Sequence, residues 1–374
     1  MFDQADQDYM RQAIELARRG LYSASPNPRV GCVLVKEGHV IGRGWHRRAG
    51  MPHAEIEALN DCRSNTGSMK ACAEPQGATA YVTLEPCSFQ GRTPPCTDAL
   101  LAAGVSKVIV GNTDPNPRVD GLQKLRDAGV EVLTGCESDA CATLNPGFFS
   151  RMQRSRPWVR VKLAMSLDGR TALANGESKW ITGEVARQDV QLWRAQADCI
   201  LTGVGTVLRD DPQMTVRLSD ELYREHGYGK VVQPLLAIAD SEIKTPEHSA
   251  LFDAERPVVF YASANESGSV NHGEIVSCPG PDGGVDLGAL LQDLATREIN
   301  EVHVEAGAAL CASLLKQQLV DELLLYVAPH VLGADAKSLF DLTGLTGMHE
   351  RVEFTYRDVQ QVGDDLRLRL SPAR

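Results

Sequence analysis

The chain has 374 residues, and at a prior of roughly 150 residues per domain this length predicts two domains rather than one. Hydrophobic residues make up 43% and charged residues 23%, values that exclude disordered and fibrous proteins. Acidic residues outnumber basic ones 49 to 38, which argues against a nucleic-acid partner. The excess is uneven, because residues 1–150 hold 15 Lys and Arg against 17 Asp and Glu, whereas residues 151–374 hold 23 against 32.

The ten cysteines are too few for a disulfide scaffold. The first residues are acidic and contain no apolar stretch, so they do not predict a secretory signal. No apolar run approaches the roughly 20 residues that a membrane-spanning helix needs. We therefore expect a cytoplasmic protein with no membrane contact, in which clustered reduced cysteines indicate a metal or catalytic site.

The first half of the chain alternates helical and strand-like patterns. Helices are expected over 9–17, 53–59, 97–103 and 122–127, and strands over 30–35, 40–41, 80–84, 107–110 and 130–133. A tight turn is expected at 36–38, and a polar segment at 63–77. Strands that alternate with helices in this way predict a three-layer α/β domain.

The pattern is interrupted by Asn145-Pro-Gly147 and by the basic stretch 151–156 before Pro157, so we place a domain boundary between residues 150 and 151. A second α/β series follows. Its strands are expected over 159–164, 199–202, 235–239, 258–261, 302–304, 323–327, 352–356 and 366–370, and its helices over 183–193, 287–296 and 310–317. No internal repeat relates the two halves.

The first half contains one imidazole and two thiols in short motifs: His53 in His-Ala-Glu, Cys87 in Glu-Pro-Cys and Cys96 in Pro-Pro-Cys. This set suits zinc and leaves a fourth position for water, whose pKa zinc can lower to about 7. Glu55 is then the group that takes a proton from the water and gives it to a leaving amine. The motifs together predict a zinc deaminase site.

Helix starts explain how this set could converge. Residues two apart on a helix diverge by roughly 200°, so His53 and Glu55 can serve one site only near a helix start. Pro52 precedes His53, and Pro94-Pro95 precede Cys96, as expected where helices begin. The alternatives are a closed structural zinc site, which would give Glu55 no role, or three unrelated buried residues.

Several segments of the first half resemble the bifunctional riboflavin-biosynthesis deaminase/reductase family. They are Ser25-Pro-Asn-Pro-Arg-Val-Gly-Cys-Val, Gly44-Trp-His46, His53-Ala-Glu55, Thr83-Leu-Glu-Pro-Cys-Ser, Gly91-Arg-Thr-Pro-Pro-Cys and Asp114-Pro-Asn-Pro-Arg-Val. The resemblance implies a cytidine-deaminase-like fold and assigns the phosphoribosyl-pyrimidine contacts to Asn27, His46, Arg92, Asp114 and Asn116. Phe89 stands where the family usually has His, and the segment after Val119 also departs from the family pattern.

The second half lacks a dinucleotide-binding fingerprint. Gly203-Val-Gly205 has no third glycine in phase, and the pattern predicts a turn. Glu305-Ala-Gly307 passes from a strand through small residues into a helix, where a phosphate could approach the helix N-terminus. A plain strand-to-helix turn would have the same pattern.

The order of further segments resembles the same family's reductase domain, which is similar to dihydrofolate reductase. They are Val161-Lys-Leu-Ala-Met-Ser-Leu-Asp-Gly-Arg-Thr, Glu177-Ser-Lys-Trp-Ile-Thr-Gly, Gln191-Leu-Trp-Arg-Ala, Gly205-Thr-Val-Leu-Arg-Asp-Asp-Pro and Thr215-Val-Arg. The resemblance assigns NADPH to Ala164, Trp180, Thr206, Asp210, Ser241, Gly307, Ala308, Ala309, Leu310, Cys311, Ala312 and Ser313. It assigns substrate to Ser178, Arg194, Met214, Arg217 and Glu305.

Physical roles can be given to some of these residues. Arg194 and Arg217 suit the ribose phosphate, although either could form a surface ion pair instead. Trp180 could lie against the cofactor or pack in a core. Lys162, in a strand, could polarise the sugar at the hydride acceptor. Glu242 stands where many relatives carry a basic residue, which bears on the choice of NADPH over NADH.

The sequence thus predicts an N-terminal three-layer cytidine-deaminase-like domain, 1–150, and a C-terminal dihydrofolate-reductase-like α/β domain, 151–374. We expect zinc-dependent deamination of a phosphoribosylaminopyrimidine, followed by NADPH-dependent reduction of the ribosyl group to ribityl. The alternatives are a reductase whose deaminase half is impaired and, against the acidic charge, a nucleic-acid deaminase. The resemblance also implies a homo-oligomer, a dimer or larger.

Overall fold

The computed structural model describes residues 2–64, 74–219, 221, 231–263 and 268–373. The chain divides into two compact units, of which the first contains residues 1–154 and the second begins at Ser155. This break falls four residues after the expected boundary at 150/151. Among the described residues, no helix is long and apolar enough to cross a membrane.

The first unit is built on a five-stranded sheet with the order β2-β1-β3-β4-β5. The strands are β1 (Gly31–Lys36), β2 (His39–Trp45), β3 (Thr79–Leu84), β4 (Lys107–Asn112) and β5 (Glu131–Thr134). Strand β1 pairs antiparallel with β2 and β3, whereas β3, β4 and β5 are parallel. The turn between β1 and β2 uses Glu37 and Gly38, both with positive φ.

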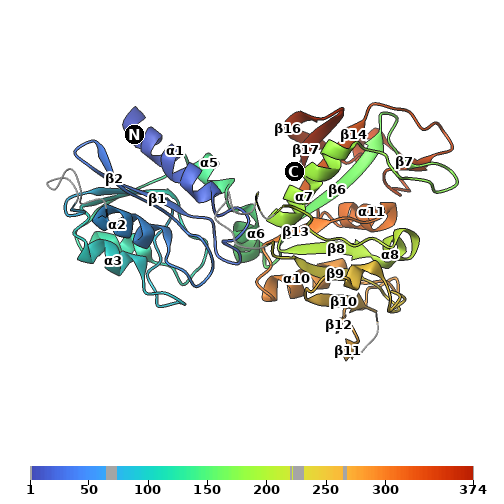
Figure 1. Cartoon of the computed structure of the whole chain (residues 1–374), viewed down its shortest axis with the longest axis horizontal. Coiled ribbons are helices and arrows are strands. Elements are labelled where there is room, and N and C mark those ends of the chain that lie inside the picture. Colours follow the sequence, from blue (N-terminus) through green and yellow to red (C-terminus); the bar gives the residue numbers. More distant parts are fainter. Residues whose placement is uncertain (1, 65–73, 220, 222–230, 264–267, 374) are drawn as a thin grey trace. The chain divides into compact units, whose positions relative to one another are not determined.

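Helices cover both faces of this sheet (Figure 1). The helices are α1 (Gln4–Arg18), α2 (Ala54–Ser64), α3 (Cys96–Ala102), α4 (Gly121–Asp127), α5 (Ser138–Ala142) and α6 (Pro146–Arg154). One apolar core joins one face of the sheet to α2, α3 and α4, and a second joins the other face to α1 and α5. The unit is therefore the expected three-layer α/β domain.

Two short helices of this unit, α5 and α6, escape the sequence patterns. Helix α6 occupies Pro146–Arg154, where Asn145-Pro-Gly147 is expected to interrupt regular structure. Proline is tolerated in the first turn of a helix because its missing N–H has no partner there, so Pro146 begins a helix instead of breaking one. Most of the expected polar segment, residues 65–73, lies outside the described residues.

The second unit is built on a ten-stranded sheet with the order β11-β12-β10-β9-β8-β13-β6-β14-β17-β16. Its strands are β6 (Trp158–Ser166), β8 (Cys199–Gly203), β9 (Leu235–Ala239), β10 (Val258–Ala262), β11 (Gly268–Val270), β12 (Gly273–Ser277), β13 (Glu301–Val304), β14 (Glu322–Ala328), β16 (Phe354–Val362) and β17 (Asp365–Pro372). The seven central strands, from β12 to β14, are parallel, and β17 and β16 close one edge antiparallel. A separate small sheet pairs β7 (Arg170–Ala172) with β15 (Lys337–Ser338).

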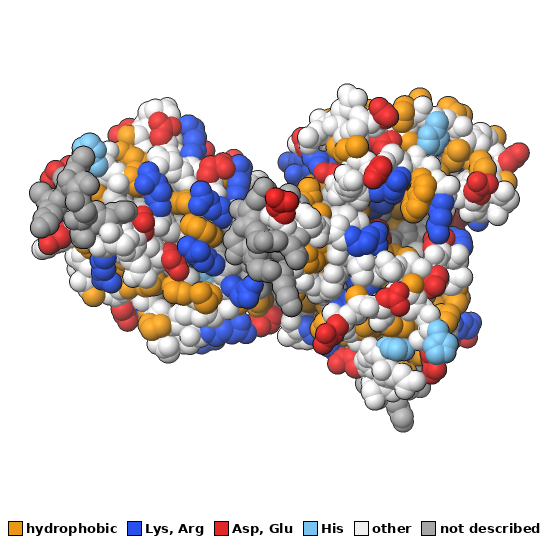
Figure 2. Space-filling view, viewed as in Figure 1, with side chains coloured by type: hydrophobic (Ala, Val, Ile, Leu, Met, Phe, Trp, Pro, Cys, Tyr) orange, Lys and Arg blue, Asp and Glu red, His pale blue; other side chains and the backbone are white. Residues whose placement is uncertain are grey.

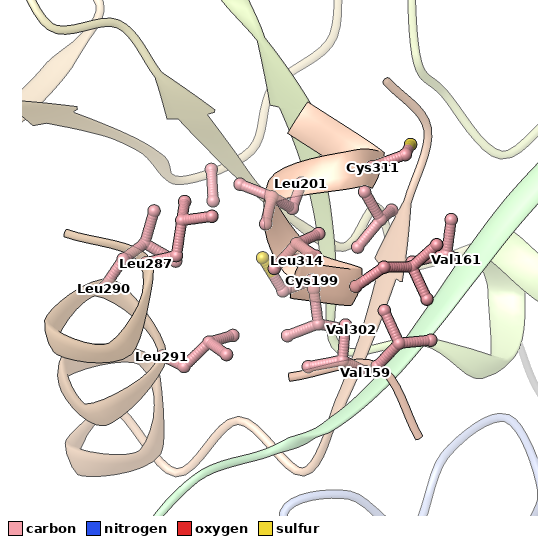
Figure 3. Close-up of a cluster of buried hydrophobic side chains, with 14 of the residues drawn as sticks. Val159, Val161, Cys199, Leu201, Leu287, Leu290, Leu291, Val302, Cys311 and Leu314 are labelled. Atoms are coloured by element: carbon pink, nitrogen blue, oxygen red, sulfur yellow. The ribbon is translucent and has the colours of Figure 1, made fainter. Parts of the chain in front are cut away.

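Helices also cover both faces of the large sheet. On one face, α10 (Leu287–Thr296) and α11 (Ala308–Lys316) supply Leu290, Leu291 and Leu314 to a core with Val159 and Val161 (Figure 3). On the other face, α7 (Glu184–Gln196) and α8 (Val204–Asp210) pack through separate apolar clusters. The expected α/β class is therefore confirmed.

Three details differ from expectation. The residues after β8 do not form a turn, because Val204 already begins α8 with Gly203 as its N-cap. The short strands β7, β11, β12 and β15 carry no clear alternation and are missed by the sequence patterns. Strand β16 begins near the expected position but continues to Val362.

Candidate functional site

Three predicted metal ligands meet in the first unit. The ligand atoms of His53, Cys87 and Cys96 all lie within 4.8 Å of one another. His53 directly precedes α2, Cys87 follows β3, and Cys96 is the first residue of α3, as the prolines before the two helices predict. The Nδ1 atom of His53 lies 3.5 Å from the Cys87 sulfur and 3.3 Å from the Cys96 sulfur.

The donor set suits zinc, which binds imidazole nitrogen and thiolate sulfur. The backbone N–H of Cys96 donates to the Cys87 sulfur at 3.3 Å. The hydrogen bond between the two thiols lowers the pKa of Cys87 and raises that of Cys96, so one of the pair is readily the thiolate, and His53 further lowers the pKa of Cys87. On its other side, His53 Nε2 lies 3.2 Å from the Thr93 hydroxyl, a contact that orients the imidazole.

Glu55 lies in the first turn of α2 with only 3% of its surface exposed. Burial raises the pKa of its carboxyl group above the ordinary value, which suits a group that both takes and gives a proton. Helix α2 packs closely against β2 at Gly44. Any larger residue there would place its Cβ 2.2 Å from the Ala54 carbonyl oxygen. This contact fixes the height of His53 and Glu55 over the sheet.

Two of the predicted deaminase substrate residues contact each other. The Asn27 amide donates to His46 Nε2 at 3.0 Å, and His46 Nδ1 donates to the Pro52 carbonyl oxygen at 3.1 Å. The His46 ring meets the His53 ring edge-on, with centroids 5.1 Å apart. Burial lowers the pKa of His46 to about 4, so the imidazole is neutral and accepts from Asn27. The structure thus brings Asn27 and His46 beside the metal ligands.

Asp114 and Asn116 lie in the loop after β4. The Asp114 N–H donates to a Glu85 carboxylate oxygen, and the other oxygen of Glu85 accepts from Leu122 N–H. Burial raises the pKa of Asp114 to about 6, although the hydrogen bond from the Asn116 N–H opposes this effect. The hydrogen bond to Glu85, two residues before Cys87, ties the Asp114 loop to the segment that carries a metal ligand. Arg92, the fifth predicted contact, is exposed.

The second unit contains a cleft of about 1010 Å³ at the carboxyl ends of its parallel strands, where α/β sheets commonly bind ligands. Most predicted reductase residues line it, namely Lys162, Ala164, Ser178, Trp180, Arg194, Thr206, Asp210, Met214, Arg217, Glu305, Gly307, Ala308, Ala309 and Leu310. Ser241, Cys311, Ala312 and Ser313 are not among its lining residues. Cys311 and Ala312 are buried on the core side of α11.

The cleft has the features that a dinucleotide phosphate group needs. The N-cap glycines of α8 and α11, Gly203 and Gly307, both line it, and helix N-termini favour negative charge. Trp180 is 68% exposed and therefore does not pack in a core. The Arg187 guanidinium lies 4.5 Å from its ring centroid. The geometry therefore suits NADPH, with an indole available to the cofactor.

Arg194 has a partner that its sequence context does not reveal. Its guanidinium donates two hydrogen bonds to Glu305, at 2.5 and 2.9 Å, and one to the Thr215 carbonyl oxygen at 2.8 Å. Burial alone would raise the pKa of Glu305, but Arg194 holds it well below the ordinary value. Arg194 is thus committed largely to Glu305, whereas the side chain of Arg217 is more exposed.

Lys162 lies in β6 beside this pair. Burial lowers the pKa of its ammonium group, the Glu305 carboxylate opposes that effect and Arg194 adds to it. The ammonium nitrogen is 5.9 Å from the Tyr326 ring centroid. The Lys162 side chain is half-buried and lines the cleft.

Sequence reasoning misses several residues that shape the sites. Thr93 lies within the Gly-Arg-Thr-Pro-Pro-Cys motif, but nothing in the motif reveals its contact with His53. Asp168 follows β6 and accepts hydrogen bonds from the N–H groups of Leu332 and Gly333. Its motif therefore anchors the 329–341 segment, whose Lys337 and Ser338 line the cleft.

Comparisons with known proteins match both units. Residues 3–112 match the family model described as the cytidine and deoxycytidylate deaminase zinc-binding region. Residues 157–368, more than half of the chain, match the model of the RibD C-terminal domain. The zinc-binding description agrees with the cluster of His53, Cys87 and Cys96.

Full-length relatives and solved structures agree. The chain is 43% identical to the riboflavin biosynthesis protein RibD of Escherichia coli strain K12, over 98% of this chain and 99% of that one. It is similar to Acinetobacter baumannii RibD, with a TM-score of 0.88, 43% identity and 99% of each chain covered. A diaminohydroxyphosphoribosylaminopyrimidine deaminase/5-amino-6-(5-phosphoribosylamino)uracil reductase from Thermotoga maritima gives a TM-score of 0.85 at 30% identity, again with 99% of each chain covered. The chain therefore belongs to the RibD family of riboflavin-biosynthesis enzymes, which join a zinc-dependent deaminase to an NADPH-dependent reductase.

Proposed function

We propose that the first unit hydrolytically deaminates 2,5-diamino-6-(5-phosphoribosylamino)pyrimidin-4-one with the residues described above. The convergence of His53, Cys87 and Cys96 beside the buried Glu55 carries this proposal. Those three residues would hold zinc, which as a Lewis acid would lower the pKa of a bound water. Glu55 moves the proton from water to the leaving amine, and its raised pKa supports both steps.

The contacts of the pyrimidine and its tail are assigned to Asn27, His46, Arg92, Asp114 and Asn116. Neutral His46 accepts one Asn27 N–H, which leaves the Asn27 amide oxygen and its second N–H for the base edge. Arg92 is exposed and suits the charged phosphate.

We propose that the cleft of the second unit reduces the ribosyl group of the resulting uracil to ribityl. The N-termini of α8 and α11, together with Trp180, would hold NADPH, which would supply the hydride when bound. Lys162 and Glu305 orient the sugar, Arg217 binds its phosphate, and Ser178 and Met214 line the same cleft. Arg194 keeps Glu305 ionised and in place.

Our proposal assigns residues 1–150 to the deaminase domain and residues 151–374 to the reductase domain. The compact units, divided at Arg154, support this division to within four residues. A cytoplasmic location without membrane or nucleic-acid partners completes the proposal. The excess of acidic over basic residues supports the lack of a nucleic-acid partner.

A homo-oligomer formed through the second unit is also proposed. Strand β16 ends the ten-stranded sheet, and Tyr356 and Val359 on it are 64% and 56% exposed. Exposed apolar side chains on an edge strand suit pairing with another copy. Light scattering that finds only monomer at micromolar concentration would refute the proposed homo-oligomer.

The two half-reactions can be tested separately in the full chain. With zinc, the protein should release ammonia from the diaminopyrimidine and then oxidise NADPH. Glu55→Gln should abolish ammonia release while the protein still binds one zinc and reduces the deaminated intermediate. Full ammonia release by Glu55→Gln would overturn its assignment, and reduction without any deamination by the unaltered chain would favour the reductase-only alternative that Phe89 raises.

A further inference from the structure

Helix α6 contacts the loop that carries Asn27, although more than 110 residues separate them in the chain. Asn145 lies immediately before α6 and is 96% buried, since only 4% of it is exposed. Its amide oxygen accepts the Arg29 backbone N–H at 2.7 Å, and its amide nitrogen donates to the Arg29 carbonyl oxygen at 2.9 Å. One side chain thus satisfies both backbone groups of a single loop residue.

Two further contacts join the same elements. The Arg29 guanidinium donates to the Leu144 carbonyl oxygen at 2.8 Å. The Arg151 guanidinium, within α6, donates to the Pro26 carbonyl oxygen at 3.3 Å. The loop is therefore held at Pro26 and at Arg29, on either side of Asn27.

The position of Asn27 matters because its amide is shared. One Asn27 N–H goes to His46 Nε2, and His46 in turn donates to the carbonyl oxygen of Pro52, the residue before the metal ligand His53. A shift of the loop would therefore move the amide away from His46 and from the base edge. Since the loop backbone is fixed through α6, the direction of the Asn27 amide depends on contacts made by Asn145 and Arg151.

We propose that Asn145 and Arg151 are positioning residues for deamination, which clamp the substrate loop on both sides of Asn27. This inference rests on the proposed function, because it takes Asn27 as a pyrimidine contact. It gives the Asn145-Pro-Gly147 segment a role within the deaminase instead of that of a neutral linker. The clamp acts on substrate binding, so it should affect KM more than kcat.

If Asn145 only fills space beside the loop, a different result is expected from its variants. Aspartate has nearly the shape of asparagine, so Asn145→Asp should be harmless if only shape matters. In the clamp, Asn145→Asp keeps the acceptor for Arg29 N–H but sets an oxygen against the Arg29 carbonyl oxygen, where a donor is needed. We therefore expect Asn145→Asp to disturb the loop at least as much as Asn145→Ala.

The test measures both half-reactions, zinc content and melting temperature for the full-length zinc-loaded protein. We expect Asn145→Asp and Asn145→Ala to raise the deaminase KM about tenfold, with kcat, zinc content and the reductase KM each changed less than about twofold. Arg151→Met should raise the same KM by a smaller factor. Tyr81→Phe is the matched control, because it removes a 2.8 Å hydrogen bond to Asp6 in the same unit without touching the loop.

The possible results distinguish failure of the clamp from failure of the proposed deaminase function. If the unaltered chain deaminates and Asn27→Ala raises KM, but Asn145→Asp and Arg151→Met both leave KM within twofold, the clamp is refuted and the function stands. If Asn145 variants do not fold, Arg151→Met decides by the same criterion. If Tyr81→Phe raises the deaminase KM as much as Asn145→Asp does, the increase reflects general destabilisation of the unit. That result would also refute the clamp. Failure of the unaltered chain to deaminate would overturn both.

Discussion

Replacement of Glu305 by glutamine should destabilise the second unit strongly. In the folded chain its carboxylate accepts two hydrogen bonds from Arg194, and His303 Nε2 lies 3.3 Å away. The side chains of Arg194 and Glu305 are only 10% and 12% exposed. Glutamine keeps the shape but removes the charge, and it turns an N–H group toward a guanidinium that has only donors.

The magnitude follows from the charge that is left behind. Removing one partner of a buried ion pair costs about 3–5 kcal/mol because the other charge stays buried without compensation. For a unit of this size, about 1 kcal/mol shifts the melting temperature by roughly 2–4 °C, so the transition of the second unit should fall by roughly 6–20 °C. The double variant Arg194→Met/Glu305→Leu removes both charges and should lose less stability than Glu305→Gln alone.

The stability difference between the unaltered chain and Glu305→Gln should depend on pH. The folded-state pKa of Glu305 is depressed, so its stabilisation is complete above the unfolded value of about 4.3 and is lost as pH falls toward the folded value. The difference between the unaltered chain and Glu305→Gln should therefore be largest near neutral pH and smaller by about 1 kcal/mol at about pH 3.5.

Calorimetry and urea unfolding measure these changes in stability. The deaminase half-reaction is the control that shows whether the first unit remains intact. A loss below about 1 kcal/mol at pH 7 would refute the assignment of Arg194 as a buried partner of Glu305. A difference that stays constant down to about pH 3.5 would refute the pKa argument.

Two further variants probe the metal site and the cleft. Thr93→Val removes the hydroxyl 3.2 Å from His53 Nε2 and should weaken zinc affinity about 10–100-fold in a competition with a chelator, with the reductase unaffected; unchanged zinc affinity would show that Thr93 does not orient the imidazole. Trp180→Ala, at a position 68% exposed in the cleft, should raise the KM for NADPH about fivefold without changing ammonia release, and an unchanged KM would remove Trp180 from the cofactor contacts.

Local motifs allow the metal site to be predicted from sequence. His53, Cys87 and Cys96 each follow a proline or precede a helix, and helix starts bring such residues together at one end of a sheet. The motifs also place Glu55 in the first turn of α2, where it lies buried beside them. Short-range chemistry and short-range geometry are therefore enough to predict this cluster.

The partners of buried charged residues cannot be predicted in the same way. Arg194 and Glu305 are 111 residues apart, and the pairing arises because α7 packs on the sheet face beside β13. An arginine in such a motif suggests a phosphate ligand, whereas the fold directs two of its N–H groups to a carboxylate and a third to the Thr215 carbonyl oxygen. The contacts of Asn145 with Arg29 are as remote, and the Pro-Gly after Asn145 favours a loop over the helix that forms.

Net charge misleads about the reductase ligands for a related reason. Residues 151–374 carry a net charge of −9, yet they are proposed to bind a dinucleotide and a sugar phosphate. Acidic and basic side chains are mixed over the visible face of the second unit (Figure 2). Among the described residues that line the cleft, however, seven are Lys or Arg and four are Asp or Glu.

The positive potential in the cleft is larger than the counts of charged side chains suggest. The ion pair between Arg194 and Glu305 removes one charge of each sign and leaves the excess of positive side chains in the cleft unchanged. The N-termini of α8 and α11 add partial positive charge without any ionised side chain. Exposed charges farther away than about 10 Å are screened at physiological ionic strength, so the phosphate groups respond to the cleft and only weakly to the acidic surface around it.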